Sequence, residues 1–67
     1  MTELGEYLSR KAINKAEVAR KTGISKSRLS QLSVNETTKL TVEELWKIAK
    51  AIEVDPCEIL SETCKNL

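Results

Sequence analysis

NKAEVARKTGISKSRLSQLS, the stretch from Asn14 to Ser33, predicts two short helices joined by a tight turn. Asn14 can cap the first helix, Lys15–Thr22, and the side chain of Glu17 is placed to reach back toward that cap. Gly23 ends the helix, because a residue without a Cβ readily adopts the left-handed conformation that a sharp C-terminal turn needs.

The second helix of this stretch begins at Lys26, with Ser25 as its cap and Leu29 and Leu32 on its inward face. Only about three residues join the two helices, so they must cross steeply, as in a helix-turn-helix. Ala19 fits this crossing, because the residue over which the second helix packs has to be small. A corner of two helices that only supports a core is the structural alternative.

The composition predicts one helical domain spanning residues 1–67, with 40% hydrophobic residues, two Gly and one Pro. A chain of this length buries a compact core but does not enclose a substrate cavity. No run approaches the roughly 20 apolar residues that span a membrane. The N-terminus also lacks the basic start and apolar run of a signal peptide, so we expect a cytoplasmic protein.

The basic residues are unevenly distributed, although the formal net charge is only +1. Residues 10–28, in and just before the helix-turn-helix, hold seven Lys and Arg and one Glu. Residues 29–67 hold four Lys and seven acidic residues. A basic face of this kind predicts a polyanionic partner, and an ordinary solvated surface is the alternative.

A further helix is expected before the motif, over residues 2–12, with Thr2 as its cap. Its apolar face holds Leu4, Tyr7 or Leu8, and Ala12. Tyr7 is expected to pack against the core with its hydroxyl at the surface. A polar loop, residues 33–41, follows the motif, and Asn35 can end the preceding helix in a left-handed conformation.

Two more helices are expected after the loop. Thr41 caps the first, which runs to about Glu53. Asp55 caps the second, in which Pro56 takes the first helical position and Thr63 lies near the end. The inward residues are Leu45, Ile48, Ala49 and Ile52 in the former helix, and Ile59 and Leu60 in the latter. No strand pattern occurs, so the predicted fold is all-α with five helices.

Two blocks of the sequence carry a family resemblance. They are Val18, Ala19, Gly23, Ile24, Ser25, Leu29 and Ser30, and then LTVEELWKIAKAIEVDPCEIL from Leu40 to Leu60. In both blocks the chain resembles the Cro/repressor type of helix-turn-helix domain, found in phage repressors and many small bacterial regulators. The resemblance covers nearly the whole chain. It implies a compact five-helix domain of the lambda-repressor-like DNA-binding type.

In such proteins the second helix of the motif lies in the major groove, and its N-terminal residues read base edges. The resemblance implies that Lys26, Ser27 and Gln31 contact bases. It implies that Arg28 reaches either a base or a phosphate. The phosphate-binding residues that it implies are Lys15, Ser25, Ser30, Asn35, Thr37, Thr38 and Lys39.

Two positions depart from the family pattern. Lys15 stands where the family commonly has a glutamine that touches a phosphate and braces the recognition helix. Lysine keeps the phosphate contact, but only as a point charge. Ser33 stands where the family often has a glutamate that bonds to the following loop, so that hydrogen bond is not expected here.

The sequence holds little catalytic or metal-binding chemistry. It has no His, and its two cysteines, Cys57 and Cys64, would lie about 10 Å apart on one helix, too far for a disulfide. A core or dimer contact is favoured for these thiols over a redox or metal role. We expect no enzymatic activity, no cofactor and no metal site. Trp46 lies beside the buried stripe of its helix and either covers the edge of the core or joins a protein contact surface.

The expected function is sequence-specific binding of double-stranded DNA by a regulator of transcription, most simply a repressor. One recognition helix reads only about four or five base pairs, so we expect a homodimer on a palindromic operator, with recognition helices about 34 Å apart. The expected dimer contacts are Trp46, Cys57, Leu60, Cys64 and Leu67. The alternative is a protein-interaction module, such as an antitoxin-like partner or an adaptor of the transcription machinery, using the last helix and Trp46. No small-molecule ligand is indicated.

Overall fold

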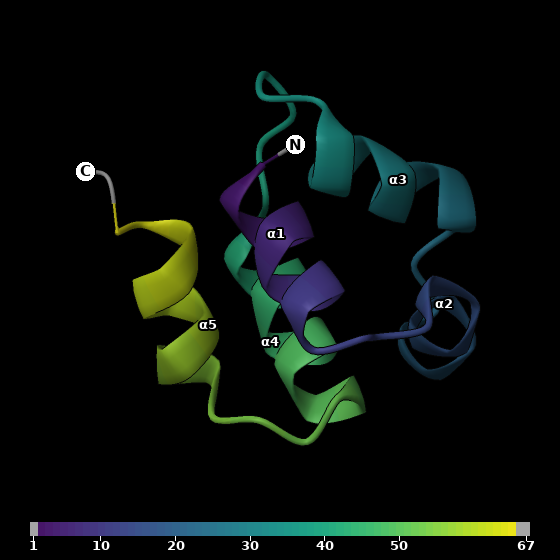
Figure 1. The fold of residues 1–67 in the computed structure, drawn as a ribbon. Helices are drawn as coiled ribbons and strands as arrows, with labels where there is room; N and C mark the ends of the chain where they lie inside the picture. The colour runs from purple at the N-terminus through teal and green to yellow at the C-terminus, as the bar shows by residue number, and fades with distance from the viewer. Residues whose placement is uncertain (1, 66–67) are drawn as a thin grey trace.

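The computed structural model describes residues 2–65 and shows five helices and no strand within them (Figure 1). The helices are α1 (Glu3–Arg10), α2 (Lys15–Thr22), α3 (Lys26–Val34), α4 (Val42–Ala51) and α5 (Pro56–Thr63). This confirms the predicted all-α fold and the order of its five helices. Leu67, a predicted dimer contact, lies outside the described residues. Within that part of the chain, no helix is long and apolar enough to cross a membrane.

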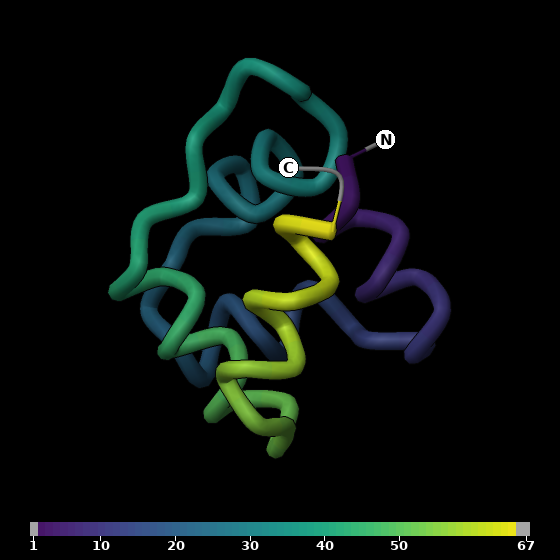
Figure 2. The backbone as a smooth tube through the Cα atoms, turned by 90° about the vertical axis from the view of Figure 1, so that its left-hand side faces the viewer, coloured from purple at the N-terminus to yellow at the C-terminus, as the bar shows by residue number. Residues whose placement is uncertain are grey.

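The core lies where the five helices meet. Helix α1 packs on α3 and α5, while α4 packs on α2 and α5. Leu29, Ile48 and Ile59 are fully buried at the centre. The other buried apolar residues are Leu4, Tyr7, Leu8, Val18, Leu32 and Ala49, with Ile13, Ala19, Ile24, Leu40, Leu45, Ile52 and Val54 packed against them. The loop between α3 and α4 arches over one end of the molecule (Figure 2).

The five predicted caps are confirmed, and each satisfies backbone groups that a helix start leaves unpaired. Thr2 accepts from Gly5, Asn14 from Ala16 and Glu17, Ser25 from Arg28, Thr41 from Glu44, and Asp55 from Cys57. Each cap contributes about 1 kcal/mol. Helices of eight to ten residues are marginal in water, so these caps and the shared core are what hold them in place.

Two expected helix ends are wrong, and Asn35 ends α3 as predicted but in another conformation. Helix α1 stops at Arg10, and Ala12 is exposed with a φ of 55°, so it is not part of the buried face. Helix α4 stops at Ala51, and Glu53 turns the chain with a φ of 59°. Asn35 follows α3 in an extended conformation, with a φ of −87°, instead of the left-handed one. The two tight turns therefore use Ala12 and Glu53, which no glycine signal marks.

Three side-chain predictions also need correction. Glu17 does not reach back to the cap, because its carboxylate accepts two hydrogen bonds from Arg20, at 2.8 and 3.0 Å. Leu60 is not inward but 51% exposed. The hydroxyl of Tyr7 is not at the surface. Tyr7 is 3% exposed, and its hydroxyl donates to the carboxylate of Glu58, which joins α1 to α5.

Candidate nucleic-acid interface

The turn between α2 and α3 is held by short local hydrogen bonds. Gly23 has a φ of 79°, and its N–H donates to the Ala19 carbonyl at 2.9 Å. The Thr22 hydroxyl donates to the Val18 carbonyl at 2.6 Å and accepts the N–H of Ile24 at 3.1 Å. A Cβ at position 23 would meet nothing within 4 Å, so glycine is needed for its backbone conformation and not for space.

Helix α3 has two distinct faces. Leu29 and Leu32 are buried in the core, as predicted, and Ser33 joins them with 1% of its surface exposed. The opposite face is open to solvent. It exposes Lys26, Ser27, Ser30 and Gln31, from the first residue of the helix to its middle. A helix anchored on one side and bare and polar on the other can enter a groove without disturbing the fold.

Arg28 is not free on that outer face, as the sequence suggested, but bound to α4 and the loop before it. Its Nε and Nη2 atoms donate to the two carboxylate oxygens of Glu44, at 2.8 and 3.0 Å, and Nη2 also donates to the Lys39 carbonyl at 2.9 Å. These hydrogen bonds lower the pKa of Glu44 to about 2 and raise that of Arg28. Glu44 closes a capping box with Thr41, so one carboxylate joins α3 to the start of α4.

The loop after α3 is compact and polar. The side-chain oxygen of Asn35 accepts the Thr37 N–H at 2.9 Å and the Thr37 hydroxyl at 2.7 Å. The Thr38 N–H donates to the Asn35 carbonyl at 3.1 Å. Asn35, Thr37 and Lys39 are exposed, whereas Thr38 is half-buried. The loop is thus folded on itself, and Arg28 of α3 donates to its Lys39 carbonyl.

The model of the Cro/C1-type helix-turn-helix DNA-binding domain matches residues 3–64. The chain belongs to this family. No curated protein and no solved structure matches it. Membership supports DNA binding and a role in the regulation of transcription, and domains of this family typically carry out no catalysis.

In this Cro/C1-type domain, hydrogen bonds around Ser33 hold the end of α3. Its hydroxyl donates to the Leu29 carbonyl at 2.8 Å, inside the helix. Its carbonyl accepts the N–H of Thr2 at 2.9 Å, and the Thr2 hydroxyl donates to the Leu32 carbonyl at 2.6 Å. The residue before α1 thus holds the end of α3. The sequence predicted only that Ser33 lacks the hydrogen bond to the following loop that a glutamate often makes in this family.

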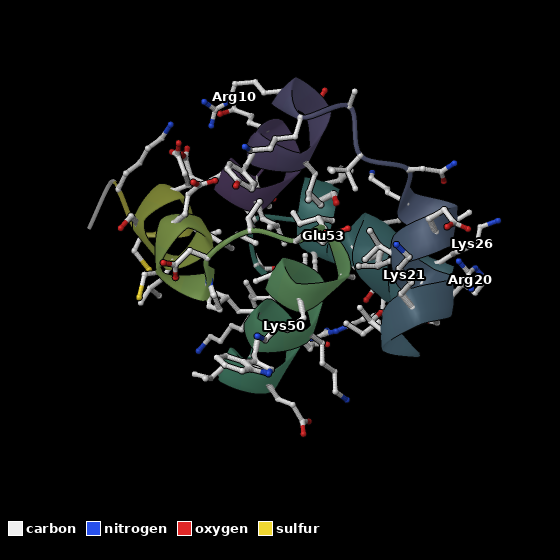
Figure 3. All side chains as sticks on the ribbon, turned by 90° about the horizontal axis from the view of Figure 1, so that it is seen from below. Arg10, Arg20, Lys21, Lys26, Lys50 and Glu53 are labelled. Carbon is white, nitrogen blue, oxygen red and sulfur yellow. The ribbon has the colours of Figure 1, made fainter. Side chains whose placement is uncertain are left out.

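The Lys and Arg side chains of residues 10–28 lie on different sides of the molecule. Arg10 and Lys11 lie beside α5, where they pair with Glu62 at 3.4 Å and Glu58 at 3.5 Å. Figure 3 shows Arg10 on the α1 side, far from Arg20, Lys21 and Lys26 on the α2–α3 side. The charge that faces the motif is therefore smaller than the count over residues 10–28 suggests. Lys15, in the first turn of α2, is half-exposed.

The predicted dimer residues lie on α4 and around α5. Trp46 is 53% exposed and Leu60 51% exposed. Cys57 is exposed and Cys64 half-buried, and both are free thiols. Trp46 is not among the residues packed against the core, so the structure does not favour its core-edge interpretation.

One contributor to the site was missed from the sequence. Glu44 lies three residues after the Thr41 cap, a spacing typical of a capping box. That spacing predicts the cap but not the pairing with Arg28, because the two residues lie sixteen positions apart.

Proposed function

We propose that this chain is a sequence-specific regulator of transcription, and most simply a repressor, that reads the major groove of double-stranded DNA with α3. The observation that carries the proposal is the division of α3 into a buried face and a bare polar face. Leu29 is fully buried, while Lys26, Ser27 and Gln31 are exposed. Such a domain represses by occupying the DNA that the transcription machinery needs.

In this proposal the three exposed side chains contact base edges. Gln31 can bond adenine through two atoms, Lys26 suits the acceptors of guanine, and Ser27 suits either. Phosphates are bound by residues around them, which are Lys15, Ser25, Ser30, Asn35, Thr37, Thr38 and Lys39. Arg28 takes a different role from the one first expected. Its pairing with Glu44 makes it a positioning residue that sets the angle of α3 against α4.

We further propose that the domain binds a palindromic operator as a homodimer. A two-fold dimer doubles the number of base pairs read and places the recognition helices about 34 Å apart. The proposed contact surface is formed by Cys57, Leu60 and Cys64, and Leu67 belongs to the same set. Trp46 is left out of it, because it lines a separate groove between α2 and α4. The half-exposed side chain of Leu60 supports this choice.

Selection of binding sites from a pool of random duplexes tests the readout. We expect one enriched sequence, and each base-reading contact is worth about 1–3 kcal/mol. Ser27→Ala and Gln31→Ala should each relax the preference at one or two base pairs. Lys39→Ala should instead weaken binding to all sequences about equally and flatten its salt dependence. Identical behaviour of the two kinds of variant across sequences would refute the division into base and phosphate contacts.

Sedimentation with and without the selected duplex tests the dimer. Two chains per duplex on an inverted repeat support it, and Leu60→Asp should then reduce the occupancy to one. One chain per duplex at saturation, on a site without an inverted repeat, rules the dimer out while leaving DNA reading by α3 intact.

A further inference from the structure

We propose that the groove between α2 and α4 binds an acidic peptide segment of a partner protein, with one large apolar side chain of that segment packed on Trp46. The groove has a volume of about 460 Å³. Its lining includes Lys21, Trp46, Lys47, Lys50, Ala51 and Glu53. Neither the base-reading nor the phosphate-binding residues take part in it, so the inference does not depend on DNA binding.

Trp46 supplies the apolar part of the groove. It is the single tryptophan of the chain and is 53% exposed. The core side of the same helix is occupied by Ile48 and Ala49, which are fully buried, and Trp46 is not among the residues packed against the core. The ammonium group of Lys50 lies 4.9 Å from the centre of the Trp46 ring. A large aromatic ring that covers no core and has a cation on one side is suited to contact with a partner.

The charges indicate what that partner is. Within residues 2–65, Arg10, Lys11, Arg20, Arg28 and Lys65 all pair with carboxylates. The six lysines left without an ion pair in this part of the chain form two groups of three. Lys15, Lys26 and Lys39 belong to the proposed DNA face, and Lys21, Lys47 and Lys50 line the groove.

Glu53 is the one acidic residue among those that line the groove. The lining therefore carries a net positive charge beside an exposed aromatic ring. An acidic segment with an apolar residue complements both features, because its carboxylates meet unpaired ammonium groups and its apolar side chain covers the ring.

The position and shape of the groove favour a peptide over DNA or a small molecule. The residues that line the groove belong to α2, to α4 and to the turn after α4, and none of them belongs to α3. Viewed from below, Lys21 and Glu53 lie near each other and Lys50 lies on the outer side of α4 (Figure 3). The three lysines are exposed. A groove lined by exposed lysines does not bury most of a small ligand, as an enclosed site would, whereas a peptide can lie across it.

Trp46 fluorescence tests the inference directly, because no other tryptophan contributes. The probe is a short blocked peptide of aspartates and glutamates around a central leucine. One matched peptide has serine for leucine, and another has asparagines and glutamines for the acids. We expect saturable binding of the acidic leucine peptide, weakened by salt, and little binding of either matched peptide. Equal binding of the serine peptide would overturn the role of Trp46, and equal binding of the neutral peptide would overturn the role of the lysines.

Protein variants provide the second arm. Lys21→Gln, Lys47→Gln and Lys50→Gln combined should weaken the acidic peptide about tenfold, at roughly twofold for each exposed charge pair. Each of the three single variants should weaken it about twofold, and Lys65→Gln, which removes one positive charge elsewhere, is the matched control for them. If Lys65→Gln loses as much affinity for the acidic peptide, the effect reflects net charge alone and the inference is overturned.

Two further outcomes identify a different occupant. A change in Trp46 fluorescence with protein concentration alone would assign the groove to a second copy of the chain. The same change with a DNA duplex that also blocks the peptide would assign it to DNA. Either result overturns the proposal, and neither bears on the reading of bases by α3.

Discussion

Replacing Glu44 by glutamine removes the charge that joins the proposed recognition helix to α4, with little change in shape. In the structure both carboxylate oxygens accept hydrogen bonds from Arg28, at 2.8 and 3.0 Å, and one of them also accepts the Thr41 N–H at 3.0 Å. A glutamine offers one acceptor, and its NH₂ group would face the guanidinium. The variant therefore loses the ion pair and at least one of the paired hydrogen bonds.

The pKa of Glu44 sets an upper limit on this loss. The hydrogen bonds from Arg28 are the largest cause of its fall to about 2, from the ordinary glutamate value of about 4.3. At about 1.4 kcal/mol for each pH unit, the carboxylate is stabilised by at most about 3 kcal/mol. The side chains of Glu44 and Arg28 are 17% and 34% exposed, so solvent screens part of the interaction. We expect Glu44→Gln to lower the free energy of unfolding by about 1–2 kcal/mol at neutral pH.

The dependence on pH follows from the direction of the shift. A carboxyl whose pKa is lowered in the folded state contributes its full stabilisation above its unfolded pKa, about 4.3. That contribution is lost as the pH falls toward about 2, where Glu44 takes up a proton in the folded chain. We therefore expect the difference in free energy of unfolding between the parent and Glu44→Gln to be largest near neutral pH. This gap should close at the acidic end, and denaturant unfolding of both proteins across this range measures it.

Glu43→Gln is the matched control. Glu43 is exposed in the same first turn of α4, so it shares the helix-dipole interaction without the bond to α3. If Glu43→Gln loses as much stability as Glu44→Gln, or if the gap does not close on acidification, the reasoning is refuted. DNA affinity gives an independent check. Glu44→Gln should weaken binding by misplacing α3, whereas tighter binding would mean that Arg28 contacts DNA better once released.

Four further substitutions test the fold. Leu29→Ala should cost about 2–5 kcal/mol by leaving a cavity at a fully buried site, and Ala19→Leu about 1–3 kcal/mol by overpacking the helix crossing. Thermal melts in which both match the parent would contradict the packing. Gly23→Ala should cost about 1–2 kcal/mol, from its φ of 79° alone, and a neutral result in denaturant unfolding would contradict that reading of the turn. Tyr7→Phe should cost about 1–2 kcal/mol by removing the hydroxyl that donates to Glu58. Burial raises the pKa of Tyr7 to about 12, so this contribution should persist to about pH 10 and disappear as the pH rises through 12; titration of unfolding at high pH checks it.

The sequence was sufficient for features that arise within one turn of chain. All five caps were predicted correctly, because a side-chain oxygen and the N–H groups two or three residues on are neighbours in any helix start. Gly23 was predicted for the same reason, since its backbone conformation is a local property. Helical periodicity likewise identified most of the buried face, including Leu29, Ile48 and Ile59.

The tertiary structure alone decided which side chains pair between helices. Arg28 and Glu44 are sixteen positions apart, and Tyr7 and Glu58 fifty-one, so no local spacing predicts either contact. The sequence grouped Arg10 with the helix-turn-helix by position, whereas packing of α1 on α5 placed it against Glu62.

The sequence thus determined the five helices and the helix-turn-helix, because caps, turns and periodicity act between near neighbours. Tertiary packing determined which positive charges remain available to a partner. Exposed Lys and Arg carry the same charge and similar local preferences wherever they occur in the chain. The arrangement of the helices decides whether a carboxylate of another helix reaches them, as Glu44 reaches Arg28, or whether they stay without an ion pair beside Trp46, as Lys47 does.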